Sequence, residues 1–90
     1  MRPEPLRRLV PRLEPLVDRA DLLAQRLSAA RLADRRLEAQ RAAGAPLWGE
    51  VARAMRDVLG AAKAEDPKAA VASVERLQQG LEALRAVGAP

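Results

Sequence analysis

The stretch PLVDRADLLAQRLSAARLADRRLEAQRAA, residues 15–43, decides the fold of this 90-residue chain. After its first proline it contains no Pro or Gly until Gly44, and Pro suits the first position of a helix. Asp34 interrupts an otherwise apolar stripe whose period of three and four residues is typical of an amphipathic helix. The stripe consists of Leu16, Ala20, Leu23, Leu27, Ala30 and Leu37. The sequence therefore predicts one long first helix over about 15–43.

Two turn signals divide the rest of the chain. The tripeptide GAP at 44–46 indicates a stop and a restart, because Gly suits a helix cap and Pro suits the first turn of the next helix. The dipeptide DP at 66–67 is a second cap and restart. We expect helices over about 47–64 and 67–87, folded as antiparallel neighbours because the turns are short. A first helix of about 42 Å would overhang the other two, at about 27 Å and 32 Å.

The N-terminal segment contains Pro3, Pro5 and Pro11, each of which removes a backbone donor and disfavours helix in the residue before it. We therefore expect 1–14 to form a Pro-rich arm or short helix, and 15–90 to form a single helical domain. The predicted fold class is all-α: an antiparallel three-helix arrangement with a long first helix, which assembles into a larger helical bundle.

The residue inventory argues against an enzyme. The chain has no Cys and no His, which removes thiolate chemistry, the commonest metal ligand and the usual proton shuttle near neutral pH. Neither Ser28 nor Ser73 therefore has a histidine to activate it. We predict a non-enzymatic protein without metal or cofactor.

No stretch approaches the length of a transmembrane segment, and no apolar signal core follows the N-terminal arginines, so the expected location is the cytoplasm.

The aromatic content is limited to Trp48, so the core must be built from Leu, Val, Met and Ala. Trp48 and Met55 share the apolar side of the predicted second helix. Large side chains contribute the most apolar area to a thin core. We therefore predict Trp48 and Met55 as core anchors.

A second, weakly apolar row follows the predicted first helix on the side away from Leu23 and Leu27. It consists of Leu22, Gln25, Ala29, Leu32, Arg36, Ala39 and Ala43. Small residues let another helix approach closely, and the two leucines would anchor it. We predict a protein-protein interface on this row, with a second copy as the simplest partner. The predicted function is an interaction module that self-associates or serves as a small subunit or regulator of a larger assembly. The alternative is an ordinary solvated face.

The charge pattern leaves a second function open. The net charge is +4, and the first half of the arginine-rich chain carries all of it. Basic residues there include Arg12, Arg19 and Arg26 at heptad spacing, followed by Arg31 and Arg35. Such a row favours a nucleic-acid backbone, although acidic residues interleave and no motif for reading DNA is present. The arginines also border the apolar stripe, where their stems can cover the edge of a core. Nucleic-acid binding is therefore the alternative function.

Overall fold

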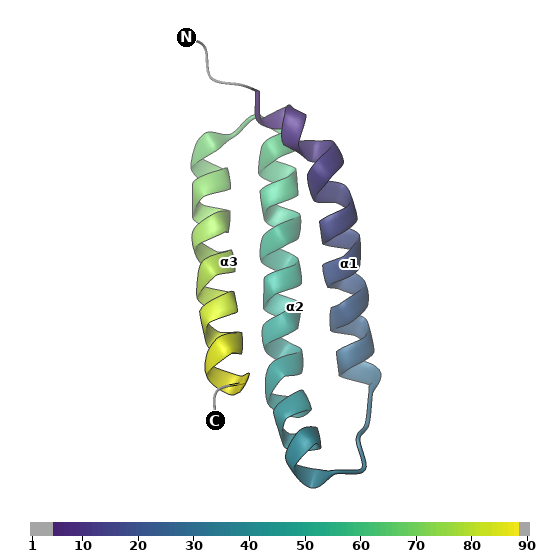
Figure 1. Cartoon of the computed structure of the whole chain (residues 1–90). Helices are drawn as coiled ribbons and strands as arrows, with labels where there is room; N and C mark the ends of the chain where they lie inside the picture. Colours follow the sequence, from purple (N-terminus) through teal and green to yellow (C-terminus); the bar gives the residue numbers. More distant parts are fainter. Residues whose placement is uncertain (1–4, 89–90) are drawn as a thin grey trace.

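The computed structural model describes residues 5–88, and this part of the chain consists of helices, turns and one short loop without any strand. The elements are a 3-10 helix η1 (Leu6–Leu9) and the α-helices α1 (Val10–Ala29), α2 (Arg35–Lys63) and α3 (Pro67–Gly88). Consecutive α-helices run antiparallel to each other (Figure 1). The predicted all-α class and the antiparallel three-helix arrangement are confirmed.

The predicted long first helix is wrong, because the chain turns between Ala29 and Arg35. Asp34 supplies the physical reason: its carboxylate accepts the backbone N–H groups of Arg36 and Leu37, at 2.9 Å and 3.1 Å, and so caps the start of α2. Ala30 is extended, with ψ of 149°. The local cap outweighs the good helix propensity of the surrounding Ala, Leu and Arg residues.

The predicted break at 44–46 is also wrong, because α2 continues through it. Pro46 costs the helix one hydrogen bond, but Gly44 and Ala45 are both buried. A Cβ atom on Gly44 would lie 3.9 Å from Leu84 of α3. Close packing of the neighbouring helices on these small residues overrides the local stop signal. As a result α2, with 29 residues, is the longest helix.

The third helix agrees with its prediction of about 67–87. Its start is capped as expected, since the Asp66 carboxylate accepts the backbone N–H of Ala69 at 3.1 Å. The turn before it places Glu65 at φ 53°. There the Glu65 carboxylate accepts the backbone N–H groups of Leu6 and Arg7, at 2.8 Å and 2.7 Å. The N-terminal segment is thereby fastened to the turn between α2 and α3.

The predicted boundary between an arm at 1–14 and a domain at 15–90 falls inside a helix. Residues 1–4 of the arm lie outside the described residues, and α1 begins at Val10 and runs through Pro15. Pro11 occupies the first turn of α1, where its missing N–H would have no partner in any case. Residues 10–14 therefore belong to α1.

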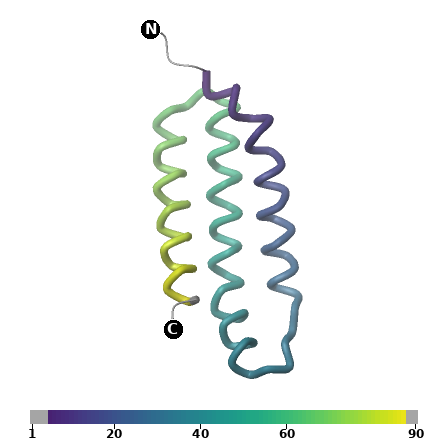
Figure 2. The backbone as a smooth tube through the Cα atoms, in the orientation of Figure 1, coloured from purple at the N-terminus to yellow at the C-terminus, as the bar shows by residue number. Residues whose placement is uncertain are grey.

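The three helices form a single layer. α2 lies between α1 and α3 and packs along both, whereas α1 and α3 lie on opposite sides of it (Figures 1 and 2). The Cα atoms extend over 55 × 21 × 15 Å, and their radius of gyration is 15.3 Å. A compact domain of 90 residues has a radius of gyration of about 12 Å. The described helices of one chain therefore do not close a bundle around a common core.

The buried residues are small. Among the described residues, the buried apolar side chains are Val17, Ala20, Ala45, Val51, Ala52, Ala54, Ala61 and Ala62. No leucine of that part is buried, and the two predicted core anchors, Trp48 and Met55, are half-buried. The seam between α2 and α3 is tight: a Cβ atom on Gly80 would lie only 2.9 Å from Cγ2 of Val51. The buried residues thus lie along two seams, one between α1 and α2 and one between α2 and α3. The larger apolar side chains lie beside these seams.

Candidate functional site

The three helices share one apolar face, which we call the open face. Its members are apolar side chains that are exposed or half-buried, and none is fully buried. They are Leu16, Leu23 and Leu27 of α1, Leu37, Trp48 and Met55 of α2, and Val74, Leu77, Leu81 and Leu84 of α3. The leucines of α1 and Leu37 belong to the apolar stripe predicted from the sequence, and Trp48 and Met55 are the predicted core anchors. Five members of the open face nevertheless remain more than a third exposed.

On α1 the open face lies beside the seam with α2. Val17 and Ala20 are buried and therefore mark the side that packs on α2. Leu16 precedes Val17 by one residue, which rotates it by about 100° around the helix. Leu23 follows Leu16 by seven residues and returns to the same side. Both leucines are 47% exposed.

On α3 the same side carries Val74 and Leu81. Ser73 and Gly80 are buried against α2, and each apolar residue follows one of them. α1 and α3 run in the same direction and contact α2 from opposite sides (Figure 1). A residue that precedes the seam on α1 and one that follows it on α3 therefore point to the same face of the layer.

A groove at one end of the open face confirms that all three helices contribute to it. The groove has a volume of about 310 Å³, and its lining includes Leu27 of α1, Trp48 of α2 and Leu84 of α3. Leu32 and Leu37, from the loop and the start of α2, extend the lining. Trp48 therefore lines an open apolar groove.

One ion pair holds the loop beside this groove. The Arg41 guanidinium donates to both carboxylate oxygens of Glu38, with a shortest distance of 2.6 Å, and to the carbonyl of Leu27 at 2.5 Å. Glu38 also accepts the backbone N–H of Leu32 at 2.9 Å. The hydrogen bonds from Arg41 and then from Leu32 lower the pKa of Glu38 from 4.5 to about 2. Hydrogen bonding to Glu38 likewise raises the pKa of Arg41. These groups clamp the loop at residues 30–34.

The predicted interface row does not exist as one row. Leu22, Gln25 and Ala29 lie on α1, Leu32 lies in the loop, and Arg36, Ala39 and Ala43 lie on α2. All are exposed, but the turn carries the last three onto a helix that runs in the opposite direction. Leu22 lies about 100° from Leu23 around α1, away from the open face. The row depended on the unbroken helix, and it fails with that helix.

The arginines proposed for nucleic acid divide into two groups, and all are exposed. Arg12, Arg19 and Arg26 lie on α1, three or four residues from Leu16 or Leu23, and thus along the outer border of the open face. Arg31 lies in the loop and donates to the carbonyls of Ser28 and Ala30, while Arg35 begins α2. The structure brings the first three into one row.

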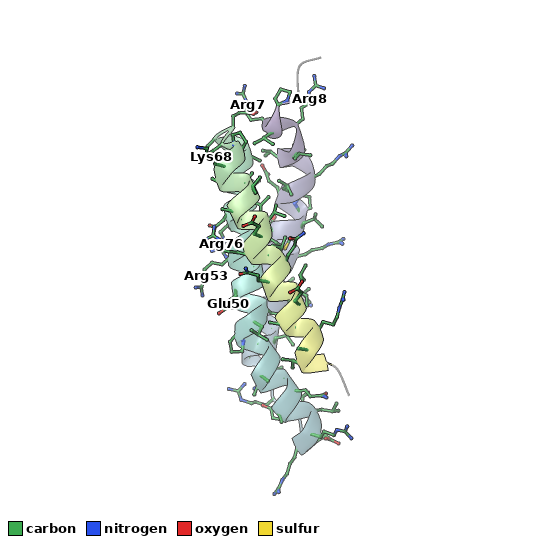
Figure 3. The ribbon with its side chains drawn as sticks, turned by 90° about the vertical axis from the view of Figure 1, so that its left-hand side faces the viewer. Arg7, Arg8, Glu50, Arg53, Lys68 and Arg76 are labelled. Atoms are coloured by element: carbon green, nitrogen blue, oxygen red, sulfur yellow. The ribbon has the colours of Figure 1, made fainter. Side chains whose placement is uncertain are left out.

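The opposite side of the layer is charged. A groove of about 320 Å³ between α2 and α3 is lined by residues that include Glu50, Arg53, Asp57 and Arg76. Figure 3 shows Glu50, Arg53 and Arg76 gathered on one side of the molecule. Arg76 lies 3.4 Å from the carboxylate of Asp57 and donates to the Ser73 hydroxyl at 3.1 Å. The two sides of the layer therefore differ in chemistry, one charged and one apolar.

Within residues 5–88 no cluster of three or more carboxylates is arranged to hold a metal ion. In the same part of the chain, none of the helices combines the length and apolar content needed to cross a membrane. Ser73 is buried at the seam and accepts a hydrogen bond, and Ser28 is exposed.

No family model matches the chain, and no curated protein and no solved structure matches it significantly. The open face is therefore the feature of the molecule from which a function is proposed.

Proposed function

We propose that this protein is a cytoplasmic, non-enzymatic helical interaction module that self-associates through its open face. One observation carries the proposal: the helices form a single layer whose leucines and valines on one side are covered by no element of residues 5–88. Burying apolar surface is the main favourable term in protein association. A second layer would supply the cover that a closed helical bundle normally provides.

The surface area supports a partner. The chain exposes 6844 Å², whereas a compact monomer of 9.7 kDa exposes about 5,100 Å². The layer is 21 Å wide in its second dimension, and the 22 residues of α3 are about 33 Å long. The open face therefore covers about 700 Å² at the level of the backbone, close to the roughly 800 Å² that each partner buries in a stable complex.

A second copy is the occupant that fits best. Its open face offers the same apolar side chains over the same area, and twofold self-association is the commonest route to a closed oligomer. Two layers placed face to face would give a six-helix bundle whose leucines are covered from both sides. A different small helical protein as partner is an alternative outcome of the experiment below.

Adjacent leucines of equal exposure give a matched test. Leu23 on the open face is 47% exposed, and Leu22 outside it is 46% exposed. Leu23→Glu should weaken self-association at least about tenfold, because it places a charge in an apolar interface. Leu22→Glu should leave association near wild type. Light scattering at several concentrations measures both, and circular dichroism confirms that each variant stays helical.

Two results would overturn this proposal. A wild-type protein that stays monomeric at millimolar concentration would remove self-association. A dimer that Leu22→Glu disrupts and Leu23→Glu spares would move the interface to the outer edge of α1. If the monomer instead captured a different helical protein in a manner sensitive to Leu23→Glu, the occupant of the face would be that partner.

The row of Arg12, Arg19 and Arg26 keeps nucleic-acid binding as the second candidate. These side chains are exposed and regularly spaced along α1. Binding of a labelled duplex that weakens steeply with salt, and that is lost when the three arginines are replaced by Gln, would support it. Absence of binding at low salt would remove it.

A further inference from the structure

We infer that two copies pair with α1 of each copy lying along α3 of the other, about a twofold axis parallel to the helices. This inference rests on the self-association proposed above and specifies its geometry. It is carried by the charges that border the open face and by the register of the helices within one chain.

Two simple twofold arrangements bring the open faces together. An axis perpendicular to the helices places α1 against α1 of the partner, and α3 against α3. The rows of Arg12, Arg19 and Arg26 from both copies would then follow the same edge of the interface. Six exposed guanidinium groups along one edge repel each other, which disfavours this arrangement.

An axis parallel to the helices places α1 against α3 of the partner. The outer edge of α3 carries Glu75 and Glu82, which are exposed and seven residues apart. Each follows an open-face residue, Val74 or Leu81, and so lies about 100° further from α2. The arginine edge of one copy thus meets a glutamate edge of the other, along both sides of the interface.

The heights of these charges along the helices agree. Within one chain Leu6 lies beside Glu65, Arg56 pairs with Asp21, and the Arg41 side chain reaches Leu27, which together fix the level of α1 on α2. Gly80 lies against Val51 and Gly44 lies near Leu84, which fixes the level of α3 on α2. Averaged over these contacts, at about 1.5 Å per residue, residue 19 lies level with about residue 76, and residue 26 with about residue 83. An axis parallel to the helices preserves these levels.

The resulting partners are Arg19 with Glu75 and Arg26 with Glu82, each within about one helical turn of the same height. Within the described part of the chain, none of these four side chains forms an ion pair or a hydrogen bond. All four are exposed and available to a second copy. Complementary rows of this kind set the orientation of helix pairs in other helical assemblies.

Charge reversal tests the pairing. Arg19→Glu/Arg26→Glu creates a chain with acidic edges on both α1 and α3, and Glu75→Arg/Glu82→Arg creates one with basic edges on both. We expect each variant to dimerise on the order of tenfold more weakly than wild type at low salt. The variant with all four changes should return to near the wild-type dissociation constant. Raising the salt concentration should reduce these differences.

Cysteine cross-linking gives an independent readout, because the chain has no Cys of its own. Leu23 lies level with about residue 80, so Leu23→Cys/Leu81→Cys should form dimers with a short bismaleimide that spans the roughly 8–10 Å between packed helices. Leu23→Cys alone should not.

The outcomes distinguish the parallel twofold axis from self-association through the open face. A dimer that is insensitive to charge reversal, and that Leu23→Cys alone cross-links, would overturn the parallel axis while leaving self-association intact. A wild type that does not dimerise overturns both. Circular dichroism of each variant excludes loss of the helical fold as the cause.

Discussion

Glu38 is the residue whose ionisation state matters most for the loop that begins α2. Its carboxylate binds the Arg41 guanidinium and the backbone N–H of Leu32, and these contacts lower its pKa from 4.5 to about 2. The folded chain therefore favours the charged carboxylate. Glu65 behaves alike: the backbone N–H of Arg7, and then that of Leu6, lower its pKa. Glu38 thereby holds the loop before α2, and Glu65 holds the segment before α1.

These pKa shifts predict a pH dependence of stability. A carboxylate with a lowered folded pKa contributes its full stabilisation above its unfolded pKa and loses it as the pH falls through its folded pKa. For Glu38 the loss should occur between about pH 4.5 and pH 2. Glu38→Gln should lower the melting temperature at pH 7, and the difference from wild type should shrink to zero near pH 2.

The control is Glu50→Gln, since Glu50 is exposed and makes no hydrogen bond within residues 5–88. It should leave the melting temperature unchanged at every pH. Thermal unfolding monitored by circular dichroism measures both variants. A Glu38→Gln variant as stable as wild type at pH 7 would show that the contacts of Glu38 with Arg41 and Leu32 do not stabilise the loop.

At the scale of single helices, Gly80 lies in the seam between α2 and α3, whereas Gly60 is an exposed residue of α2 outside that seam. A Cβ atom at Gly80 would meet Val51 at 2.9 Å, whereas one at Gly60 would meet nothing within 4 Å. Both residues lie inside helices, where alanine is favoured over glycine. The two glycines therefore separate helix propensity from packing.

Gly80→Ala should destabilise the protein by about 1–2 kcal/mol, because the added methyl group forces α2 and α3 apart. Gly60→Ala should stabilise it by about 0.5–1 kcal/mol, through helix propensity and the unfolded state. Urea unfolding measures both free energies. Equal effects of the two substitutions would show that the seam is looser than 2.9 Å implies.

The helix boundaries show what local sequence can and cannot predict. The Asp66 cap and the start of α3 were predictable because a good cap and a proline coincide there. Asp34 carries the same kind of capping signal, but it stands inside an Ala-rich stretch whose periodicity favours a continuous helix. The break expected at 44–46 failed for a different reason. Gly44 and Ala45 serve the packing of three helices, and a local pattern does not contain that information.

For the whole molecule, periodicity identified the apolar side of each helix but not what covers it. The stripe that contains Leu16 and Leu23 predicts a helix face that a core covers. Instead α1 and α3 pack on opposite sides of α2 through smaller residues, and the larger side chains remain on one face. Whether three helices close into a bundle or form a layer depends on the angle between two seams. That angle is a tertiary property, so the candidate interface could not be placed from sequence alone.

The most direct test of the central claim is small-angle X-ray scattering of the wild-type protein over a series of concentrations. Scattering reports mass and shape together. Self-association through the open face predicts a mass of twice the 9.7 kDa of one chain, in a particle two helical layers thick. The mass should fall to one chain only on dilution. A mass of 9.7 kDa at every concentration would contradict self-association, and a monomer as compact as a closed three-helix bundle would also contradict the open layer.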